Sequence, residues 1–360
     1  MTTLTTLPRL VEAGLVEPAQ VGALAPVVAE FRVAVTPAMR AAIRDRGDGV
    51  ARQFLPSVEE LVIRPEELAD PIGDRAHEPV PGLTHRYPDR AILHLTQTCA
   101  VYCRFCFRRE TVGDAGTLSD AALEAIYAHL AATPAIREVI LTGGDPMVLS
   151  ARRLGAVIGR LAGLGTLDAV RIHTRVPVVA PERITPAMIR ALKSPVPVWL
   201  VVHTNHVQEL GEGARLALGR LADAGVPLLS QTVLLRGVND STEALEALFR
   251  ALYRLRVKPY YLHHCDLARG AGHFRTTIAK GQAIMAQLRG RVSGAMLPTY
   301  VLDIPGGHGK VPVGPGYLEP APGGWVVTDP QGRQHGYADP DKNENFLRRT
   351  SPPPIAGFDA

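Results

Sequence analysis

Cysteine is scarce in this chain of 360 residues, which contains only four. Three of them, Cys99, Cys103 and Cys106, fall within eight consecutive positions. Such sparse and clustered cysteines do not suit a disulfide framework, and they are typical of a protein that works in a reducing compartment. We therefore expect a cytoplasmic protein whose clustered thiols bind a metal ion or a metal cluster.

Long apolar runs are also missing. No stretch reaches the roughly 18 uninterrupted apolar residues that a membrane-spanning helix needs, although 46% of the residues are hydrophobic and can supply a core. The first eight residues lack the basic and apolar regions of a signal peptide. The net charge is only +4, with both signs interspersed, so we expect neither a membrane nor a nucleic acid as a partner.

Short apolar, β-branched runs alternate with helical patterns from residue 86 onward. Their length and composition are typical of parallel strands buried on both faces. Ser119, Ser150, Thr185 and Ser241 are placed to cap the helices between them. Six strand–helix units are too few for a closed eight-unit barrel, so we predict the α/β class with a partial (β/α)6 barrel. The six predicted strands are 91–96, 138–142, 169–174, 198–203, 229–235 and 259–263.

The two flanking regions have different patterns. Residues 1–85 predict an N-terminal helical segment that prolines interrupt, with helices at 21–31 and 37–46. Residues 296–360 predict a small C-terminal extension with a glycine-rich loop and a hairpin that pairs 324–328 with 334–337. The chain should therefore have three parts, with the barrel at 86–295 in the middle.

Unusual polar residues follow the carboxyl ends of the predicted strands. The carboxyl ends of parallel strands meet at one end of a barrel, where chemistry gathers in such folds. The sequence therefore predicts a single site there. In strand order its residues are the cysteine motif, Gly143-Gly144-Asp145-Pro146, 173–175, 203–206, Gln231 with 236–240, and 263–266.

The cysteine spacing C-x3-C-x2-C leaves two interpretations of the metal. Three thiolates are one short of a closed tetrahedral zinc site, which Cys265 or a histidine would have to complete. They suit an iron–sulfur cluster that keeps one iron open for a small-molecule ligand.

The same spacing, with Phe105 directly before the last cysteine, resembles the radical S-adenosylmethionine (SAM) enzymes. The following Arg108-Arg109 narrows the resemblance to the lysine 2,3-aminomutase family. It implies that Cys99, Cys103 and Cys106 hold a [4Fe–4S] cluster whose fourth iron binds SAM. Gly143, Gly144 and Asp145 resemble a motif whose backbone receives the SAM amino group. The resemblance also implies that SAM contacts His173, Asn205 and Gln231.

The segment from Asp303 to Lys310 resembles the one that carries the pyridoxal 5′-phosphate (PLP) lysine of these aminomutases. A lysine on a side-chain-poor loop can reach a cofactor and form an imine. The usual glycine at position 308 is a histidine here, and it could crowd the loop. Residues 85–90 resemble the phosphate-binding segment, which implies that Arg86, Tyr87 and Arg90 hold the PLP phosphate.

Three further residues match family positions that bind the substrate. Arg108 matches the partner of the substrate carboxylate, and Asp266 and Asp303 match the two carboxylates that receive the lysine ε-ammonium. Two anions that face one cation select a basic side chain and reject an acidic one. Homologues that act on glutamate replace these aspartates, so both residues favour lysine. Arginine is the alternative, since a guanidinium also pairs with carboxylates.

The resemblance therefore implies an isomerase that moves the 2-amino group of L-lysine to C3 and produces β-lysine. One alternative is a related aminomutase that supplies β-lysine for modification of a translation elongation factor. An alternative of another class is a metal-binding sensor without catalysis. The implied partners are a one-electron donor such as flavodoxin or ferredoxin, and a second copy in a homodimer. No cysteine follows Cys265 to form the C-terminal zinc site that joins subunits in some aminomutases.

Overall fold

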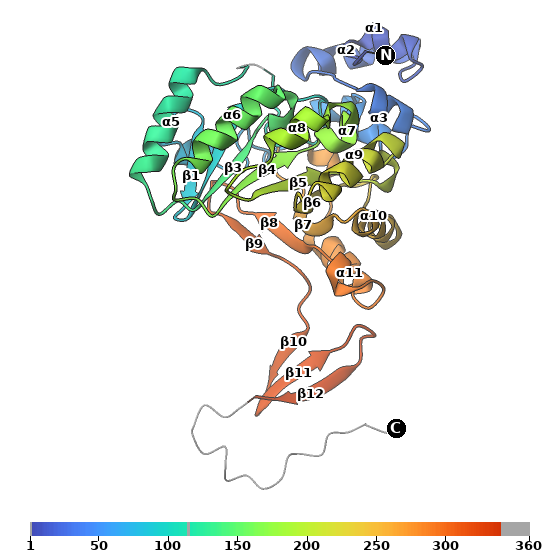
Figure 1. The fold of residues 1–360 in the computed structure, drawn as a ribbon. Coiled ribbons are helices and arrows are strands. Elements are labelled where there is room, and N and C mark those ends of the chain that lie inside the picture. Colours follow the sequence, from blue (N-terminus) through green and yellow to red (C-terminus); the bar gives the residue numbers. More distant parts are fainter. Residues whose placement is uncertain (1, 114–115, 340–360) are drawn as a thin grey trace.

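The computed structural model describes residues 2–113 and 116–339, and its centre is a curled sheet of nine strands that lie in sequence order. Seven strands are parallel, and one antiparallel strand closes each edge. Figure 1 shows the sheet wrapped into a half-barrel. The strands are β1 (Leu83–Tyr87), β2 (Arg90–Thr96), β3 (Glu138–Gly143), β4 (Ala169–Thr174), β5 (Val198–His203), β6 (Leu228–Leu234), β7 (Lys258–His264), β8 (Thr299–Asp303) and β9 (Lys310–Pro312).

The predicted partial barrel is confirmed. All six expected strands are present as β2 to β7, with ends that differ from the prediction by at most one residue, and β8 adds a seventh parallel strand. Helices cover the outer face between successive strands (Figure 1). They are α5 (Asp120–Ala132), α6 (Ala151–Ala162), α7 (Val176–Val179), α8 (Pro186–Ala191), α9 (Glu212–Asp223), α10 (Thr242–Arg254) and α11 (Ile278–Leu288).

The four predicted helix caps are confirmed as well. The side chains of Ser119, Ser150, Thr185 and Ser241 each accept a hydrogen bond from the backbone N–H three residues later. This satisfies one of the N–H groups that a helix leaves without an internal partner. The helices then bury one apolar face against the sheet, as α6 does with Leu154, Val157, Ile158 and Leu161.

The expectation that the strands are buried on both faces holds for β3 and is wrong for β2, β4 and β6. Burial alternates along β2, β4 and β6. In β4, Val170 and Ile172 are fully buried under the helices, whereas Arg171 and His173 on the opposite face are only half-buried. The reason is that the inner face lines a cavity instead of packing against another layer. The polar side chains on the inner face of the strands therefore point into this cavity.

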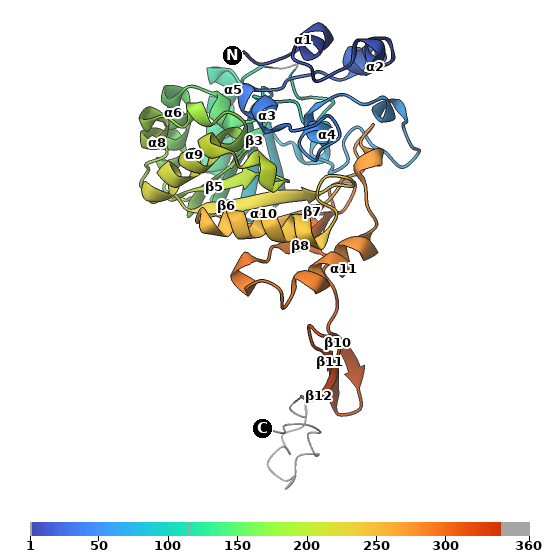
Figure 2. The same cartoon turned by 90° about the vertical axis from the view of Figure 1, so that its right-hand side faces the viewer.

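The N-terminal helices pack against the segment that carries the cysteines. They are α1 (Leu7–Glu12), α2 (Val21–Glu30), α3 (Pro37–Ala42) and α4 (Ala51–Phe54), and Figure 2 shows α3 and α4 beside one end of the sheet. The Tyr102 N–H donates to the Ala34 carbonyl at 3.0 Å, and the Arg104 N–H donates to the Gln53 carbonyl at 2.9 Å. The helix predicted at 37–46 ends at Ala42, because Ile43 leaves the helical conformation.

A buried ion-pair cluster fixes this attachment. The Glu60 carboxylate, in the short 3-10 helix η2 (Val58–Leu61), accepts hydrogen bonds from Arg104 at 2.6 and 2.8 Å and from Arg109 at 2.5 Å. All three side chains are essentially inaccessible to solvent. Buried charges are tolerated when they are paired and hydrogen-bonded in this way.

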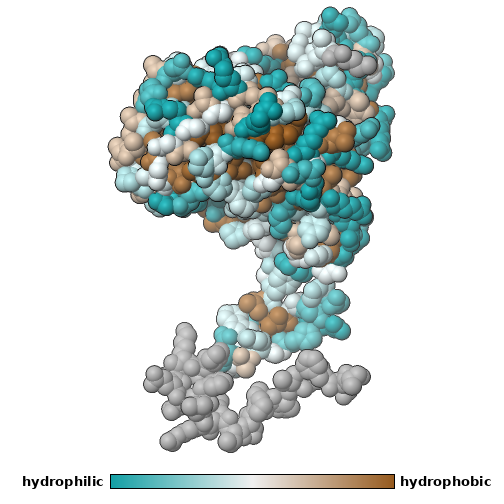
Figure 3. Space-filling view, in the orientation of Figure 1, coloured by the Kyte–Doolittle hydropathy of each residue, from teal (hydrophilic) through white to brown (hydrophobic). Residues whose placement is uncertain are grey.

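The C-terminal region forms a separate small sheet below the barrel (Figures 1 and 2). The predicted hairpin is confirmed as β11 (Gly324–Thr328) and β12 (Gln334–Ala338), and a third strand, β10 (Leu318–Ala321), was not predicted. Apolar side chains gather on this sheet (Figure 3). The division of the chain at residues 85 and 295 stays a prediction, and β1 spans the first of these positions. In the described ranges, no helix is long and apolar enough to cross a bilayer.

Candidate active site

A cavity of about 760 Å³ opens on the inner face of the half-barrel. This volume lies within the range that suits small-molecule and cofactor sites. Its wall contains Cys99, Cys103 and Cys106 from the loop after β2, together with Lys310 from β9. The sequence-based hypothesis required the three sulfur atoms and the lysine amine to face one space, and the structure brings them together.

The Lys310 amine is held inside the cavity by two neighbours. Its Nζ forms an ion pair with the Asp303 carboxylate and lies 3.2 Å from His263 Nδ1. The Lys310 backbone N–H donates to the Tyr87 hydroxyl at 3.0 Å, so a residue predicted to bind phosphate also anchors the lysine strand. The amine is therefore positioned and charge-balanced by the protein alone.

The glycines before Lys310 allow the loop to pack tightly. Gly307 has a φ of +85°, and a Cβ there would come within 2.7 Å of the His77 ring. Only glycine combines this left-handed conformation with such a close approach at low cost. The His308 side chain is exposed to solvent, so the crowding that we expected from it does not occur.

The two aspartates predicted to bind a substrate ammonium have opposite pKa shifts. Burial raises the pKa of Asp266 to about 7, with help from the negative charge of Asp303. Burial alone would also raise the pKa of Asp303, but the hydrogen bond from His263 and the Lys310 charge hold it well below its ordinary value. The pair therefore carries between one and two negative charges at neutral pH.

Arg108 lies on the cavity wall, but its guanidinium is not free. It donates from Nε and Nη2 to the Asp74 carboxylate at 3.0 and 2.8 Å. Asp74 also accepts a hydrogen bond from Arg86 at 3.3 Å. Burial alone would raise the pKa of Asp74, but the charges of Arg108, His94 and Arg86 and the hydrogen bonds from Arg108 together lower it. The sequence analysis missed Asp74, although two cavity-facing arginines without a nearby anion could have signalled a missing partner.

The three residues predicted to hold a phosphate all line the cavity. Arg86 donates to the Ile72 carbonyl at 2.5 Å, and its Nε is buried without a partner. The Arg90 guanidinium lies 3.9 Å from the centre of the Tyr87 ring and pairs with Asp89 at 2.8 Å. A buried donor without a partner calls for a ligand, so this corner fits an anionic group such as a phosphate.

The three clustered cysteines and Cys265 do not form a site for a single metal ion in the described part of the chain. Within 2–113 and 116–339, no group of three or more His, Cys, Asp or Glu side chains is arranged to hold a single ion. Cys265 is buried among Phe105, Leu235, Val238 and Phe274 and is not part of the cavity wall. A zinc site needs four donors around one ion, so the arrangement does not support the zinc interpretation with Cys265 as the fourth ligand.

Burial keeps the cysteine thiols protonated when they are metal-free. It raises the pKa of Cys106 to about 11, with a further contribution from the nearby Cys103. The thiolate is the form that ligates metal, so binding of a cluster has to displace these protons. Cluster binding therefore releases protons, and it should weaken as the pH falls.

The Gly-Gly-Asp segment after β3 supports the cysteine loop. A Cβ at Gly144 would collide with the Thr98 carbonyl oxygen. The Gly144 N–H donates to the Thr96 carbonyl, and the Asp145 N–H donates to the Thr98 carbonyl at 2.8 Å. The glycines therefore bring β3 against the chain that leads directly into Cys99.

Asp145 fixes the next strand end in turn. Its carboxylate accepts hydrogen bonds from the Thr174 hydroxyl and the Arg175 N–H, both at 2.7 Å. Burial raises the pKa of Asp145. The carboxylate lies on the cavity wall but already has protein partners.

Histidines from three strands present unpaired nitrogen atoms. The Nε2 atoms of His173, His203 and His263 are buried without a partner, and all three residues line the cavity together with Gln231. Burial lowers the pKa of each histidine, so the rings are neutral. His173 and Gln231, which the resemblance assigns to SAM, therefore lie in the same cavity as the three cysteines. His203 and His263 stand at the ends of predicted strands, but the sequence analysis assigned no role to either.

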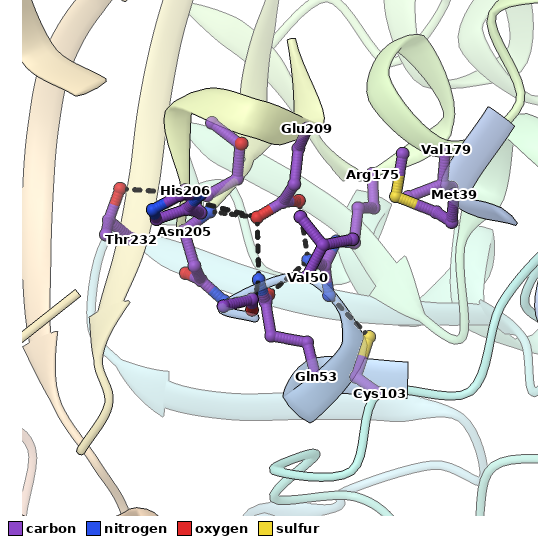
Figure 4. Close-up of polar contacts among 12 residues, drawn as sticks. Met39, Val50, Gln53, Cys103, Arg175, Val179, Asn205, His206, Glu209 and Thr232 are labelled. Carbon is purple, nitrogen blue, oxygen red and sulfur yellow. Dashed lines mark hydrogen bonds and ion pairs between the residues drawn. The ribbon is translucent and has the colours of Figure 1, made fainter. Parts of the chain in front are cut away.

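Asn205 is a correction to the predicted site. It is 0% exposed and does not lie on the cavity wall. Its side chain donates to Gln53 Oε1 at 2.9 Å and accepts from the Val233 N–H at 2.8 Å (Figure 4). Both polar atoms are therefore used inside the protein, and no direct contact with SAM is expected.

The sequence of this chain is similar to known protein families and to several known proteins. Residues 285–346 match the family described as lysine-2,3-aminomutase, and residues 88–169 match a 4Fe-4S single cluster domain. L-lysine 2,3-aminomutase from Fusobacterium nucleatum is 42% identical over 86% of this chain and 74% of its own length. L-lysine 2,3-aminomutase from Clostridium subterminale is 43% identical over 82% of this chain and 72% of its own length. Glutamate 2,3-aminomutase from Clostridioides difficile is 37% identical over 80% of this chain and 69% of its own length.

Replacing Gly144 tests the link between the glycine turn and the cysteines. In Gly144→Ala the new methyl group displaces Thr98, one residue from Cys99. We expect iron and sulfide to bind about tenfold more weakly or worse, because the shell behind metal ligands typically contributes that much. Iron and sulfide per chain after anaerobic reconstitution measure the effect.

Gly159→Ala in α6 is the matched control, because a Cβ at Gly159 meets nothing within 4 Å. This change should leave the iron content unaltered and raise stability by up to about 1 kcal/mol. Equal iron content in the two variants would contradict the role assigned to Gly144.

Proposed function

Because the chain belongs to the lysine 2,3-aminomutase family, we propose that it moves the 2-amino group of L-lysine to C3 and produces β-lysine. The shared cavity is the observation that carries this proposal, since three clustered cysteines and Lys310 line it together. The family membership rests on the identity to the relatives described above. The substrate rests on the two aspartates within the same cavity.

The cavity has a place for each group that the reaction needs. When bound, the cluster and SAM supply a 5′-deoxyadenosyl radical that removes and returns a hydrogen atom, while PLP carries the migrating amino group. Cys99, Cys103 and Cys106 would hold the cluster, and His173 and Gln231 would contact SAM. The unpaired imidazole nitrogen of His173 fits a polar ligand.

The other end of the site would hold PLP. Lys310 would bind it covalently, and Arg86, Tyr87 and Arg90 would hold its phosphate. The unpaired Nε of Arg86 fits an anionic ligand at this position. His263 lies within hydrogen-bond reach of the Lys310 amine and is neutral, so it is suited to accept the proton that this amine must lose.

Charge balance explains how a basic substrate is selected. The Lys310 ammonium neutralises Asp303 in the structure, and PLP held at Lys310 would take this cation away from Asp303. Asp266 and Asp303 would then face each other without a cation, which favours entry of the substrate ε-ammonium. An acidic side chain would add a third negative charge and be rejected.

The paired arginine Arg108 would receive the substrate carboxylate. Its bond to Asp74 keeps the guanidinium satisfied in the absence of substrate. Two oxygens of Asp74 serve Arg86 and Arg108 together. Asp74 would therefore hold both cations in the orientation that the anionic ligands need.

The partners and compartment follow from the same chemistry. All four cysteines are free, and three of them must be reduced to bind a cluster. This favours the cytoplasm, and it requires an external one-electron donor such as flavodoxin or ferredoxin. Neither nucleic acid nor membrane takes part in this proposal.

We also propose a homodimer in which a second copy covers the small C-terminal sheet. Strand register places the side chains of Leu318, Trp325 and Tyr337 on one face, together with Pro320 and Val327. Leu318 is 57% and Tyr337 is 61% exposed. A sheet face with this apolar content is typical of an interaction surface, and a second copy could supply an identical face.

The proposed activity is tested by product analysis. Enzyme reconstituted anaerobically with SAM, PLP and a reductant should convert L-lysine into β-lysine, and arginine and glutamate should remain unchanged in mass spectrometry.

Lys310→Ala should form no product and keep its iron–sulfur absorption, whereas the exposed Lys193→Ala should remain active. An active Lys310→Ala enzyme would remove PLP from the reaction. Product stereochemistry separates the metabolic enzyme from a relative that serves an elongation factor.

The raised pKa of Asp266 predicts a pH dependence. Its anionic form attracts the substrate ammonium, and protonation below about pH 7 removes that attraction. We therefore expect kcat/KM for L-lysine to fall as the pH drops below about 7. Asp266→Asn should abolish this dependence and raise the KM at least tenfold, because loss of one partner from a buried charge pair costs about 2 kcal/mol or more. The exposed Asp223→Asn should change neither, and a persistent acid limb in Asp266→Asn would assign the dependence elsewhere.

The dimer is tested by sedimentation velocity. Leu318→Asp places a charge on the proposed contact face and should shift the protein toward monomer. Leu216→Asp is the matched control, because Leu216 on α9 is 54% exposed but lies far from this sheet in sequence and fold. Monomeric wild-type protein would contradict the proposed dimer.

A further inference from the structure

A buried arginine contacts one of the three clustered cysteines directly. Arg175, which follows β4, is only 5% exposed. Its Nη1 donates to Cys103 Sγ at 2.8 Å, while its Nη2 donates to Gln53 Oε1 at 2.6 Å and to Glu209 Oε2 at 2.7 Å (Figure 4). The guanidinium therefore bridges a sulfur atom on one side and a carboxylate on the other.

The arginine cannot easily leave this position. Its guanidinium carbon lies 4.6 Å from the centre of the Phe54 ring and 5.5 Å from that of the Phe105 ring. Its backbone N–H is held by Asp145 at 2.7 Å. Two aromatic faces and a fixed backbone leave it little freedom to turn toward solvent.

The carboxylate behind the arginine is equally fixed. Glu209, in the 3-10 helix η6 (Val207–Glu209), has a side chain that is 0% exposed. Its Oε1 accepts hydrogen bonds from Gln53 Nε2 at 2.9 Å and from the N–H groups of Asn205 at 2.9 Å and His206 at 2.8 Å. These donors hold the carboxylate in its ion pair with the Arg175 guanidinium.

The Arg175 cation lies between the Cys103 sulfur atom and the Glu209 carboxylate. The cation stands directly against Cys103, and the anion stands one residue further away. A positive charge and a hydrogen bond on a ligating sulfur stabilise the more negative, reduced state of an iron–sulfur cluster. A negative charge behind that cation weakens the effect.

We propose that Arg175 is a positioning residue that raises the reduction potential of the cluster through Cys103, and that Glu209 limits this increase. The inference rests on the proposed function, because it requires a cluster at the three cysteines. One electron from the external donor enters the oxidised cluster, and no bond forms or breaks. Arg175 keeps its proton and its hydrogen bond in both states.

The proposal also explains why the N-terminal segment reaches into the barrel. Gln53 on α4 contacts Arg175, Glu209 and Asn205, and its Nε2 also donates to the Gly49 carbonyl at 2.9 Å. Gln53 thereby fixes the distance between the cation and the anion. Asn205 serves as a support for this arrangement instead of a SAM contact.

The test is the midpoint potential of the reconstituted full-length protein, measured by anaerobic redox titration with electron paramagnetic resonance detection. Arg175→Gln should shift the potential to a more negative value, because the cation is lost. Glu209→Gln should shift it to a more positive value, because the cation then acts without its counter-charge. Arg175→Lys should lie between wild type and Arg175→Gln. A purely structural role would not produce shifts of opposite sign.

Arg183→Gln is the control, since Arg183 donates to the carbonyl groups of Met147 and Val148 and contacts no sulfur. Its potential should equal that of the wild type. If Arg175→Gln does not fold, Arg175→Lys and Glu209→Gln still decide the question. Unchanged potentials, or shifts of the same sign, in variants that carry a full cluster would overturn the inference. A wild-type protein that assembles no cluster would instead overturn the proposed function.

Discussion

Charge compensation in and beside one cavity is the constraint on which this structure depends. The half-barrel keeps several cations away from bulk water, and an unpaired buried charge costs several kcal/mol. Each of these cations is therefore paired with a carboxylate, and Glu60 and Asp74 each serve two arginines. The pairs are Lys310 with Asp303, Arg108 with Asp74, Arg175 with Glu209, and Arg104 and Arg109 with Glu60.

This constraint gives the N-terminal segment a role in the site. Glu60 and Asp74 precede the first strand of the sheet, yet both neutralise arginines in and beside the cysteine loop. Gln53, from the same segment, accepts a hydrogen bond from Arg175, which pairs with Glu209 beside Cys103. The parallel strands alone would place the cysteines but leave their arginines without partners. The segment before β1 therefore supplies the carboxylates that neutralise the arginines in and beside the cysteine loop.

Local patterns were sufficient for most of the fold and for the residues of chemical interest. Apolar runs located β2 to β7, and short motifs located the three cysteines and Lys310, which line one cavity. Contacts between distant segments could not be predicted in the same way. Asp74 and Glu209 carry no local signal, because their function depends on arginines 34 residues away in each case. Asn205 was assigned to SAM from its place after a strand, whereas its side chain points into the Gln53 network.

Anomalous diffraction at the iron edge, from crystals of the reconstituted protein with PLP, tests the central claim most directly. The account predicts an iron peak enclosed by Cys99, Cys103 and Cys106, with continuous electron density from PLP to the Lys310 nitrogen across the same cavity. Iron at another position, or PLP attached to a lysine outside the cavity, would contradict it.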